Sequence, residues 1–306
     1  MKVELSVVVP VLNEELNISE LISRITQTAT QITSNYEIII IDDGSSDNSW
    51  SKIKRESLIN NKIKGIKLSR NFGHHSAITA GLEKSNGDWI VVMDGDLQDQ
   101  PEGISKLYNK TLEGFDIVFV SRQNRTEKIH YKILQKIFYK ILNKLSGVDY
   151  NSSFANFSIV NRKVVDAYMS LPEQSRFYMT MINWLGFNKS FIFLDQGERK
   201  HGRPSYTFKK RVNLAIDILL SFSDTPLRLI IRFGLLTATI SFFSMLYIVF
   251  IAIIKGFTSI GWASLMASVL FSTGIIVTSL GIVGAYVGKI FIETKKRPIY
   301  IISEIS

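Results

Sequence analysis

Residues 36–49 read YEIIIIDDGSSDNS, which is typical of a strand, a loop and the start of a helix in an α/β domain. The isoleucine run is β-branched and ends in two aspartates, and the serines and asparagine after them are good helix N-cap residues. Similar short apolar runs lie at 5–10, 63–68, 89–94 and 116–121. Helical stretches lie between the runs, at 14–33, 46–60, 74–85 and 101–112. This alternation predicts a doubly wound α/β domain, with a mostly parallel sheet covered on both faces.

Ligands of such sheets bind beyond the carboxyl ends of the strands. The loops that can form a site are therefore 10–15, 42–48, 69–75, 94–101 and 121–126. At the end of the second strand, the adjacent Asp42 and Asp43 suggest hydrogen bonds to donors on a ligand, such as a base N–H or ribose hydroxyls.

The fourth of these loops carries an acidic cluster, in the stretch VVMDGDLQDQP at 91–101. Side chains alternate along an extended segment, so Asp94, Asp96 and Gln98 are expected to point the same way. Two carboxylates and an amide oxygen suit a hard divalent cation, Mg²⁺ or Mn²⁺. Gly95 is expected to leave space for a bulky ligand beside the metal. The alternative is a solvated acidic turn ahead of the next helix.

Neither a GxxxxGK[ST] loop nor a GxGxxG motif occurs in this part of the chain. Their absence excludes a P-loop nucleotidase and an ordinary dinucleotide oxidoreductase. A cation held by two or three protein groups usually shares its remaining positions with substrate phosphates. The sequence therefore predicts a nucleotide diphosphate bound through a metal at the end of a parallel sheet.

The chain has 306 residues, a formal net charge of +9 and no cysteine. Its length allows about two domains at roughly 150 residues each. The lack of cysteine excludes disulfides and thiolate metal sites, and it fits a reducing compartment. The first ten residues, MKVELSVVVP, lack the pattern of a signal peptide, so the N-terminal domain is expected to stay in the cytosol.

Residues 233–254 and 256–288 contain no charged side chain, and about 20 apolar residues cross a bilayer. Two membrane spans are expected, at about 230–254 and 264–290; the alternative is a buried helical hairpin in a soluble domain. Basic residues flank the outer ends of the two spans, at Arg228, Arg232, Lys289, Lys295, Lys296 and Arg297. Only Lys255 lies between the spans, so the positive-inside rule places both ends of the pair in the cytoplasm.

The expected organisation is a cytosolic domain at 1–206, an amphipathic juxtamembrane helix at 207–228, and an anchor with a short cytosolic tail at 229–306. Within the cytosolic domain, the stretch 128–145 has a lysine at every fourth residue and an apolar face. A basic amphipathic helix of this kind suits an anionic membrane surface, and the alternative is a helix packed on the sheet.

Four motifs carry a family resemblance: PVLNEE at 10–15, IIIDDGSSDNS at 39–49, LSRNFGHHSAITAGL at 68–82 and MDGDLQDQPE at 93–102. In their order and spacing the chain resembles the family-two glycosyltransferases of the GT-A fold. The two-span anchor narrows the resemblance to the polyprenyl-phosphate glycosyltransferases. That group includes dolichol-phosphate mannose synthases and bacterial undecaprenyl-phosphate transferases for glucose and aminoarabinose. The resemblance covers nearly the whole chain.

The resemblance implies an inverting, metal-dependent transfer of a hexose from a nucleotide sugar to undecaprenyl or polyprenyl phosphate. The reaction would take place at the cytoplasmic face of the plasma membrane, with Mg²⁺ or Mn²⁺ as cofactor. The sequence does not decide between uridine and guanosine, and its bacterial-looking composition favours UDP-glucose or a related UDP-sugar as donor. The product would serve cell-envelope polysaccharide assembly. The implied partners are the donor, the lipid acceptor and the membrane, with no nucleic acid, and a homo-oligomer is compatible with the sequence.

The resemblance also implies which residues bind the donor and the metal. The residues that border or contact the donor nucleotide are Pro10, Asn13, Glu14, Asp42, Asp43 and Arg70. The residues that hold the metal bridging the donor phosphates are Asp94, Asp96 and Gln98.

Basic residues after the fifth strand and in a later loop are implied to bind phosphate. Arg122 and Arg125 lie in SRQNR at 121–125. The segment ERKHGRPSYTF at 198–208 resembles a loop that covers the active site, although Pro204 and a missing lysine depart from the family pattern. The candidate contacts to the acceptor phosphate in this loop are Arg199, His201, Arg203, Ser205 and Tyr206.

Asn156, in FANFSIVNR at 154–162, stands where these relatives usually have an aspartate that is proposed as a catalytic base. A phosphate monoester has a second pKa of about 6, so a lipid phosphate arrives mostly deprotonated and needs no base. Asn156 is therefore expected to orient the acceptor or a sugar hydroxyl, and to act in catalysis beside Asp94, Asp96 and Arg122. The asparagine is equally compatible with a different sugar or with an inactive relative.

Three alternatives stay open: a GDP-mannose-dependent polyprenyl-phosphate mannosyltransferase, a subunit of a processive polysaccharide synthase, and an inactive membrane scaffold. A processive synthase needs a membrane channel, for which two spans per chain are few. In addition, QSRFY at 174–178 does not match the Gln-x-x-Arg-Trp motif of such enzymes. The scaffold is supported by Asn156 alone, and the intact acidic cluster argues against it.

Overall fold

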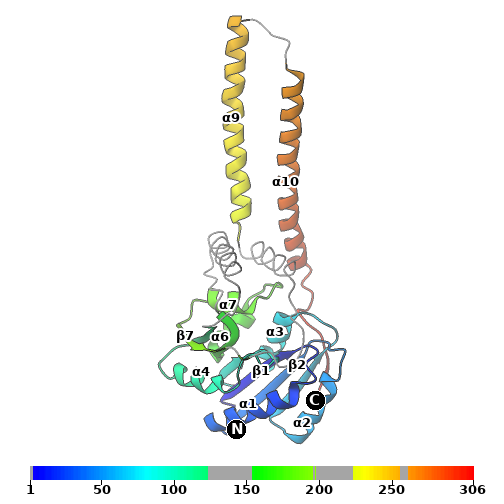
Figure 1. Ribbon diagram of the computed structural model, residues 1–306, viewed down its shortest axis with the longest axis vertical. Helices are drawn as coiled ribbons and strands as arrows, with labels where there is room; N and C mark the ends of the chain where they lie inside the picture. Colours follow the sequence, from blue (N-terminus) through cyan, green and yellow to red (C-terminus); the bar gives the residue numbers. More distant parts are fainter. Residues whose placement is uncertain (1–2, 123–153, 196, 198–222, 256–260) are drawn as a thin grey trace. The chain divides into compact units, whose positions relative to one another are not determined.

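The computed structural model describes residues 3–122, 154–195, 197, 223–255 and 261–306 (Figure 1). The chain divides into two units, which are described separately. The head comprises Met1–Tyr139, Asp149–Thr207 and Lys296–Ser306, and the helical unit comprises Lys140–Val148 and Phe208–Lys295. The expected basic helix at 128–145 and most of the expected juxtamembrane helix at 207–228 lie outside the described residues.

The head contains one eight-stranded mixed sheet, in the order β7-β5-β6-β4-β1-β2-β3-β8. The strands are β1 (Leu5–Val11), β2 (Tyr36–Asp42), β3 (Ile63–Leu68), β4 (Trp89–Val92), β5 (Ile117–Arg122), β6 (Phe154–Asn161), β7 (Lys189–Leu194) and β8 (Ile302–Ile305). The four central strands, β1 to β4, are parallel, and β7 is parallel to β5. β6 is antiparallel to β4 and β5. The expected α/β class is confirmed, and the carboxyl ends of β1 to β4 meet at one edge of the sheet, called here the carboxyl edge.

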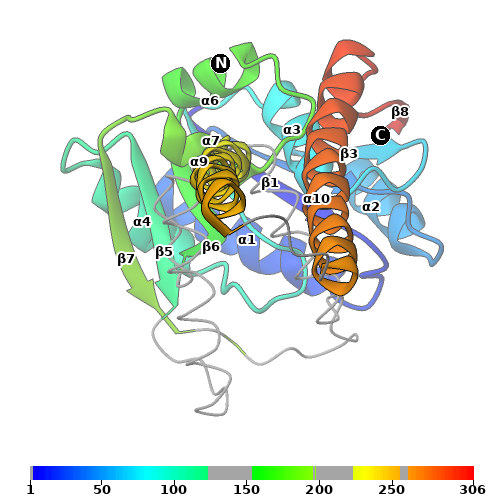
Figure 2. The same ribbon diagram turned by 90° about the horizontal axis from the view of Figure 1, so that it is seen from above.

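Helices cover both faces of the sheet, as Figure 2 shows for α1 and α3 on either side of β1. The helices of the head are α1 (Ile18–Ile32), α2 (Ser49–Ile59), α3 (His74–Lys84), α4 (Gly103–Thr111), α6 (Arg162–Ser170) and α7 (Tyr178–Trp184). β1 is buried along its whole length. Its Val7 and Val9 belong to the same core as Leu21 of α1, whereas Val8 lies against Gly81 of α3. A strand buried on both faces explains the continuous apolar run in its sequence.

The tail of the chain is part of the sheet, which nothing in the sequence pattern predicted. β8 runs antiparallel to β3 at the edge of the sheet. The N–H of Ser69 donates to the carbonyl of Ile301 over 2.9 Å, and the N–H of Ser306 donates to the carbonyl of Gly65 over 3.0 Å. Glu304 accepts from Trp50 Nε1 at 2.8 Å and from Lys54 Nζ at 2.6 Å. The tail therefore shields the outer edge of β3 and fixes the start of the loop that follows it.

We expect removal of residues 299–306 to destabilise the head. The deletion leaves the β3 edge and Trp50 without these partners, at about 1 kcal/mol per hydrogen bond. The two backbone bonds at the β3 edge amount to about 2 kcal/mol, or roughly 5 °C in Tm. Thermal melting of the full chain in detergent measures the effect, and Ile305→Thr is the control because Ile305 is exposed and threonine keeps the strand. A melting temperature within about 2 °C of the intact chain would contradict the role given to β8.

The helical unit contains two long helices, α9 (Thr225–Lys255) and α10 (Trp262–Thr294). Thr225–Ile248 has a mean hydropathy of 1.8 and Ser268–Thr294 a mean hydropathy of 2.0, so both are long and apolar enough to cross a bilayer. Neither candidate span is buried within the structure. The two expected spans fall within these helices, and the exposed apolar side chains argue for the membrane and against the buried hairpin.

Candidate functional site

The loops that follow β1 and β2 are hydrogen-bonded to one another. Asn13, in the left-handed region at φ 57°, donates its N–H to Ser45 Oγ at 2.9 Å. Its side-chain oxygen accepts from the N–H of Ser46 at 2.8 Å. The N–H of Glu14 donates to Ser49 Oγ at 2.9 Å. These hydrogen bonds join the loop after β1 to the loop after β2. Asn13 and Glu14, which are predicted to border the donor nucleotide, therefore lie in a loop with fixed contacts, next to Pro10 at the buried end of β1.

Asp42 and Asp43 lie side by side at the end of β2, and the structure gives them different surroundings. Asp42 is fully buried. Its Oδ1 accepts from the N–H of Ser45 at 3.0 Å, whereas Oδ2 has no hydrogen-bond partner among the described residues. A buried carboxylate oxygen without a protein donor is rare in folded proteins.

Asp43 holds the loop that follows β3. Its two oxygens accept from the N–H groups of Phe72 at 2.7 Å and Gly73 at 2.9 Å. Burial raises the pKa of this carboxyl even though the two bonds lower it. Arg70 lies exposed in the same loop, with its guanidinium 4.0 Å from the centre of the Phe72 ring. The structure thus gives Asp43 a scaffolding role that the sequence did not predict, and its contact with ribose stays a prediction.

The acidic cluster forms a turn, called here the acidic turn, at residues 94–99. β4 already ends at Val92, and Leu97 is left-handed at φ 60°, so the expectation of an extended segment is wrong. The expectation that Gly95 leaves space for a bulky ligand is also wrong. A Cβ at this position would come within 2.6 Å of Val11 Cγ1, so the space is already taken by the protein. The three predicted metal ligands, Asp94, Asp96 and Gln98, are nevertheless partly exposed, while the residues between them are buried.

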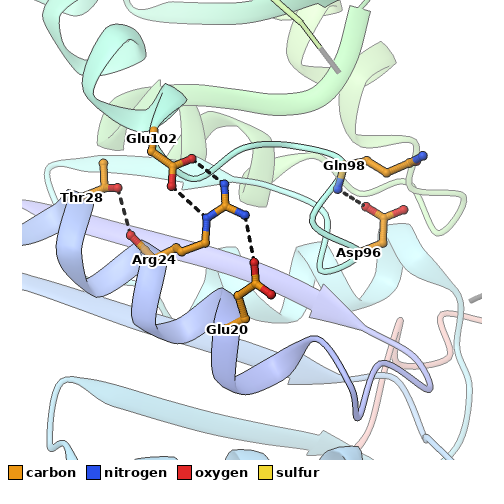
Figure 3. Close-up of polar contacts among 6 residues, drawn as sticks. All are labelled: Glu20, Arg24, Thr28, Asp96, Gln98 and Glu102. Carbon is orange, nitrogen blue, oxygen red and sulfur yellow. Dashed lines mark hydrogen bonds and ion pairs between the residues drawn. The ribbon is translucent and has the colours of Figure 1, made fainter. Parts of the chain in front are cut away.

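Contacts on both sides hold the acidic turn in place (Figure 3). Asp96 Oδ1 accepts from the backbone N–H of Gln98 at 3.1 Å, and the Gln98 side chain takes no part in that contact. Just beyond the turn, Glu102 receives two hydrogen bonds from Arg24 of α1, at 2.8 and 2.7 Å. This pairing lowers the pKa of Glu102. The N–H of Gly197 donates to the carbonyl of Gln98 at 2.9 Å.

His74 joins the acidic turn to Asn156. Its Nε2 lies 3.2 Å from Asp94 Oδ1 and 3.0 Å from the side-chain nitrogen of Asn156. The Asn156 nitrogen is 3.5 Å from the same Asp94 oxygen. Burial lowers the pKa of His74, but the carboxylates of Asp94, Asp43 and Asp96 outweigh it and raise the pKa above its ordinary value. Sequence reasoning brought Asp94 and Asn156 to one site and placed His74 at the start of a helix near the nucleotide, but gave it no contact with either residue.

His75 gives the head a dependence on pH. Burial, with the charge of His74, lowers the pKa of His75 to about 3. The unfolded residue takes a proton near pH 6.5, so the unfolded chain is favoured as the pH falls below that value. We expect the free energy of unfolding to fall by up to about 2 kcal/mol between pH 6.5 and 5. The raised pKa of His74 has the opposite effect on the pH dependence. Protonated His74 stabilises the folded chain fully below pH 6.5, and this stabilisation is lost at higher pH.

Melting curves at pH 7 and pH 5 for the wild type and His75→Asn measure the effect of His75 alone, because His74 is present in both. Asparagine keeps an acceptor for the N–H of Tyr178, which donates to His75 Nδ1 at 3.4 Å. The variant should lose less stability on acidification than the wild type. Equal losses would show that His75 does not carry the dependence.

The chemistry of the acidic turn fits a divalent cation. Asp94 and Asp96 present carboxylate oxygens on a partly exposed face, and Mg²⁺ and Mn²⁺ prefer oxygen ligands. Within the described ranges, no group of three or more His, Asp or Glu side chains is placed to hold a metal. The arrangement therefore suits a cation that takes its other ligands from a bound phosphate. The part of Gln98 in such a site stays a prediction.

The remaining predicted residues are the basic and hydroxyl side chains. Arg122 is the last residue of β5, where its backbone pairs with Leu194 of β7. The others lie outside the described residues; they are Arg125, Arg199, His201, Arg203, Ser205 and Tyr206.

Comparisons with known proteins bear on the family and the fold of the chain. The family model "Glycosyl transferase family 2" matches residues 6–169. The uncharacterized glycosyltransferase YkcC of Bacillus subtilis (strain 168) is 36% identical over 305 residues, which cover 99% of this chain and 94% of the relative. The undecaprenyl-phosphate 4-deoxy-4-formamido-L-arabinose transferase of Aeromonas hydrophila is 33% identical over 305 residues, which cover 98% and 93%.

Among solved structures, glucosyl-3-phosphoglycerate synthase from Mycobacterium tuberculosis, in complex with Mn²⁺, UDP and glucosyl-3-phosphoglycerate, matches with a TM-score of 0.53. The match covers 73% of this chain and 81% of that chain at 20% identity. A mannosyltransferase from Pyrobaculum calidifontis, in complex with GDP-Man and Mn²⁺, matches with a TM-score of 0.51 at 15% identity. That match covers 72% of this chain and 64% of the mannosyltransferase chain. At these identities the likeness concerns the fold alone.

Proposed function

The chain belongs to glycosyl transferase family 2 and is a glycosyltransferase of the GT-A fold, and from this premise we propose that it transfers a hexose from a UDP-sugar to polyprenyl phosphate. One observation carries the proposal: a head with two neighbouring carboxylates at its carboxyl edge is joined, in one chain, to two helices apolar enough to cross a bilayer. Such a chain would hold its active site near a lipid. The sequence identity with an undecaprenyl-phosphate sugar transferase supports the same acceptor class.

The donor nucleotide would lie across the hydrogen-bonded loops that follow β1, β2 and β3. The buried Oδ2 of Asp42 is an acceptor for a base N–H or a ribose hydroxyl, since it has no donor among the described residues. Pro10, Asn13 and Glu14 would border the nucleotide on one side. Arg70, which lies exposed on Phe72, would approach the base or the diphosphate.

Asp94 and Asp96, with Gln98, would hold Mg²⁺ or Mn²⁺ at the acidic turn. When bound, such a cation neutralises charge on the diphosphate of the donor. The protein contributes the fixed turn, because ligands held in place before the reaction need no reorganisation during it. Arg122 and Arg125 would add positive charge beside the phosphates.

In the transfer step an oxygen of the lipid phosphate attacks the anomeric carbon, and the bond from that carbon to the diphosphate oxygen breaks. Attack opposite to the leaving group inverts the anomeric configuration. The second pKa of a phosphate monoester is about 6, so the nucleophile is mostly deprotonated at neutral pH and needs no base. This explains how Asn156 can replace an aspartate: its amide would orient the acceptor or a sugar hydroxyl. The segment 198–206 would contact the acceptor phosphate through Arg199, His201, Arg203, Ser205 and Tyr206.

The place of β8 supports a membrane topology. The chain leaves the head to form α9, and after α10 it returns to pair with β3 of the same sheet. Two crossings would therefore begin and end on the same side of the membrane. The basic residues outside the spans favour the cytoplasmic side of the inner membrane. Donor and lipid phosphate would then meet at the cytoplasmic face.

A donor panel tests the proposal. Membranes containing the protein are incubated with Mn²⁺, added polyprenyl phosphate and radiolabelled UDP-glucose, other UDP-sugars or GDP-mannose, and the organic phase is counted. Label that enters the lipid from a UDP-sugar supports the proposal. Lipid label from GDP-mannose alone would identify a mannosyltransferase instead, and a long water-soluble polymer would identify a processive synthase. No label from any donor would favour the inactive scaffold.

A further inference from the structure

His74 is the residue that brings the acidic turn, α3 and β6 together. Its Nε2 lies 3.2 Å from Asp94 Oδ1 and 3.0 Å from the amide nitrogen of Asn156. The three residues come from separate elements and are far apart in the sequence. Asp94 and Asn156 already have proposed roles in the transfer, whereas nothing above gives one to His74.

The backbone on which His74 lies is fixed from the loop side. His74 is the first residue of α3, and Gly73 precedes it at φ 99°. The N–H of Gly73 donates to Asp43, which also accepts from the N–H of Phe72. The loop therefore cannot shift without losing two hydrogen bonds to a buried carboxylate, and the start of α3 is held against the end of β2.

The imidazole is also supported from the helix side. The rings of His74 and His75 meet edge to face with centroids 5.6 Å apart, and His75 meets Phe177 in the same way at 5.4 Å. The N–H of Tyr178 donates to His75 Nδ1. This row of rings leaves His74 little freedom to turn away from Asp94.

A hydrogen bond to one carboxylate oxygen limits how the carboxylate can rotate. For metal-binding carboxylates, partners of this kind orient the ligand, and their loss typically weakens metal affinity or activity by 10–100-fold. The Nε2–H of His74 donates to Asp94, so this nitrogen acts on a ligand and not as one, and the amide nitrogen of Asn156 lies 3.0 Å from it. The amide nitrogen of Asn156 makes a second contact, at 3.5 Å, to the same Asp94 oxygen.

We propose that His74 is a positioning residue, which holds the Asp94 carboxylate in one arrangement and so sets the affinity of the acidic turn for its divalent cation. This inference rests on the proposed function, because it presumes that Asp94 is a metal ligand. It goes beyond that function in naming a residue that acts on the metal site without touching metal or sugar.

Mn²⁺ binding to the full-length protein in detergent tests the inference. Free Mn²⁺ is followed by electron paramagnetic resonance during titration in the presence of UDP or GDP, with the Mn²⁺–nucleotide complex measured separately. His74→Ala removes the contact, and His74→Asn places its amide at the position of Nδ1, short of Asp94. His74→Gln reaches the position of Nε2 and restores a donor there. Lys84→Ala, at the far end of the same helix, is the matched control.

We expect the alanine and asparagine variants to weaken Mn²⁺ binding by about 10–100-fold, while the glutamine variant stays within about threefold of the wild type. Melting temperatures without metal, compared at a pH above the raised pKa of His74 where its contribution to stability is lost, should agree among all variants, and excess Mn²⁺ should restore kcat in His74→Ala.

Two results would overturn this inference and leave the proposed function standing. One is a His74→Ala variant that binds Mn²⁺ as tightly as the wild type, and the other is a His74→Gln variant that binds Mn²⁺ as weakly as His74→Ala. A loss of Mn²⁺ binding that tracks a fall in melting temperature would also overturn it, because a merely structural residue behaves that way. A wild type that binds no Mn²⁺ with either nucleotide would instead overturn the proposed metal dependence, and the inference with it.

Discussion

Replacing Asp96 with asparagine is expected to lower kcat/KM for sugar transfer by about 10³-fold or more, and Asp94→Asn is expected to do the same. Each change keeps the shape of the side chain and removes its negative charge. A hard cation held by only two carboxylates loses much of its binding when one becomes an amide. A 10³-fold loss corresponds to about 4 kcal/mol of transition-state stabilisation, which is the size expected for a group acting on charge that develops in the reaction.

The head should remain folded in both variants, because removing one of two neighbouring like charges relieves repulsion. Asp116→Asn is the matched control, since Asp116 immediately precedes β5 and so lies at the opposite edge of the sheet, where it pairs with Lys163 at 2.7 Å. Transfer to lipid should be unchanged in the control. Retention of more than about a tenth of wild-type activity in Asp96→Asn would contradict the role of the acidic turn.

The second large effect is expected from Gly44→Ala. Gly44 has φ 76°, and a Cβ there would lie 2.6 Å from the carbonyl carbon of Arg70 and 2.6 Å from the nitrogen of Asn71. These are backbone atoms, which cannot rotate aside as a side chain can. The left-handed conformation alone costs an alanine about 1–2 kcal/mol. Displacement of the loop held by Asp43 adds to this, so we expect a total loss of about 3–5 kcal/mol and a higher KM for the donor.

The variant Gly114→Ala separates the cost of the left-handed conformation from the cost of the close approach to Arg70 and Asn71. Gly114 is also left-handed, at φ 92°, but nothing lies within 4 Å of a Cβ built on it. It should lose only about 1–2 kcal/mol and leave the donor KM unchanged. Chemical denaturation of the two variants, with donor titration, measures the difference. Equal stability of the two variants would show that the close approach at Gly44 does not hold the loops together.

Sequence patterns predicted the parallel part of the fold well, because its signals are local. The apolar runs at 36–42 and 63–68 coincide with β2 and β3. The loops between strands and helices followed from the same runs, and so did the carboxyl edge of the sheet. β8 could not be found in this way, because its four residues pair with β3 from more than 200 residues away in the chain and show no distinct pattern.

The candidate site was predictable in its residue types but not in its geometry. The alternation of Asp94, Asp96 and Gln98 was derived for an extended segment, and a left-handed Leu97 replaces that segment with a turn. A non-glycine residue adopts this conformation only when the surrounding fold holds it there. In the same way, the bonds from Asp43 to the loop after β3 depend on tertiary packing, which the composition of either loop does not show.

The most direct test of the account is the position of Mn²⁺ in crystals of the full-length protein grown with UDP. An anomalous difference map locates the ion without assumptions about the chemistry. We expect one peak within coordination distance of the carboxylates of Asp94 and Asp96, in contact with the diphosphate of a nucleotide whose base lies near Asp42. An acidic turn without Mn²⁺, while UDP is bound at another edge of the sheet, would contradict it.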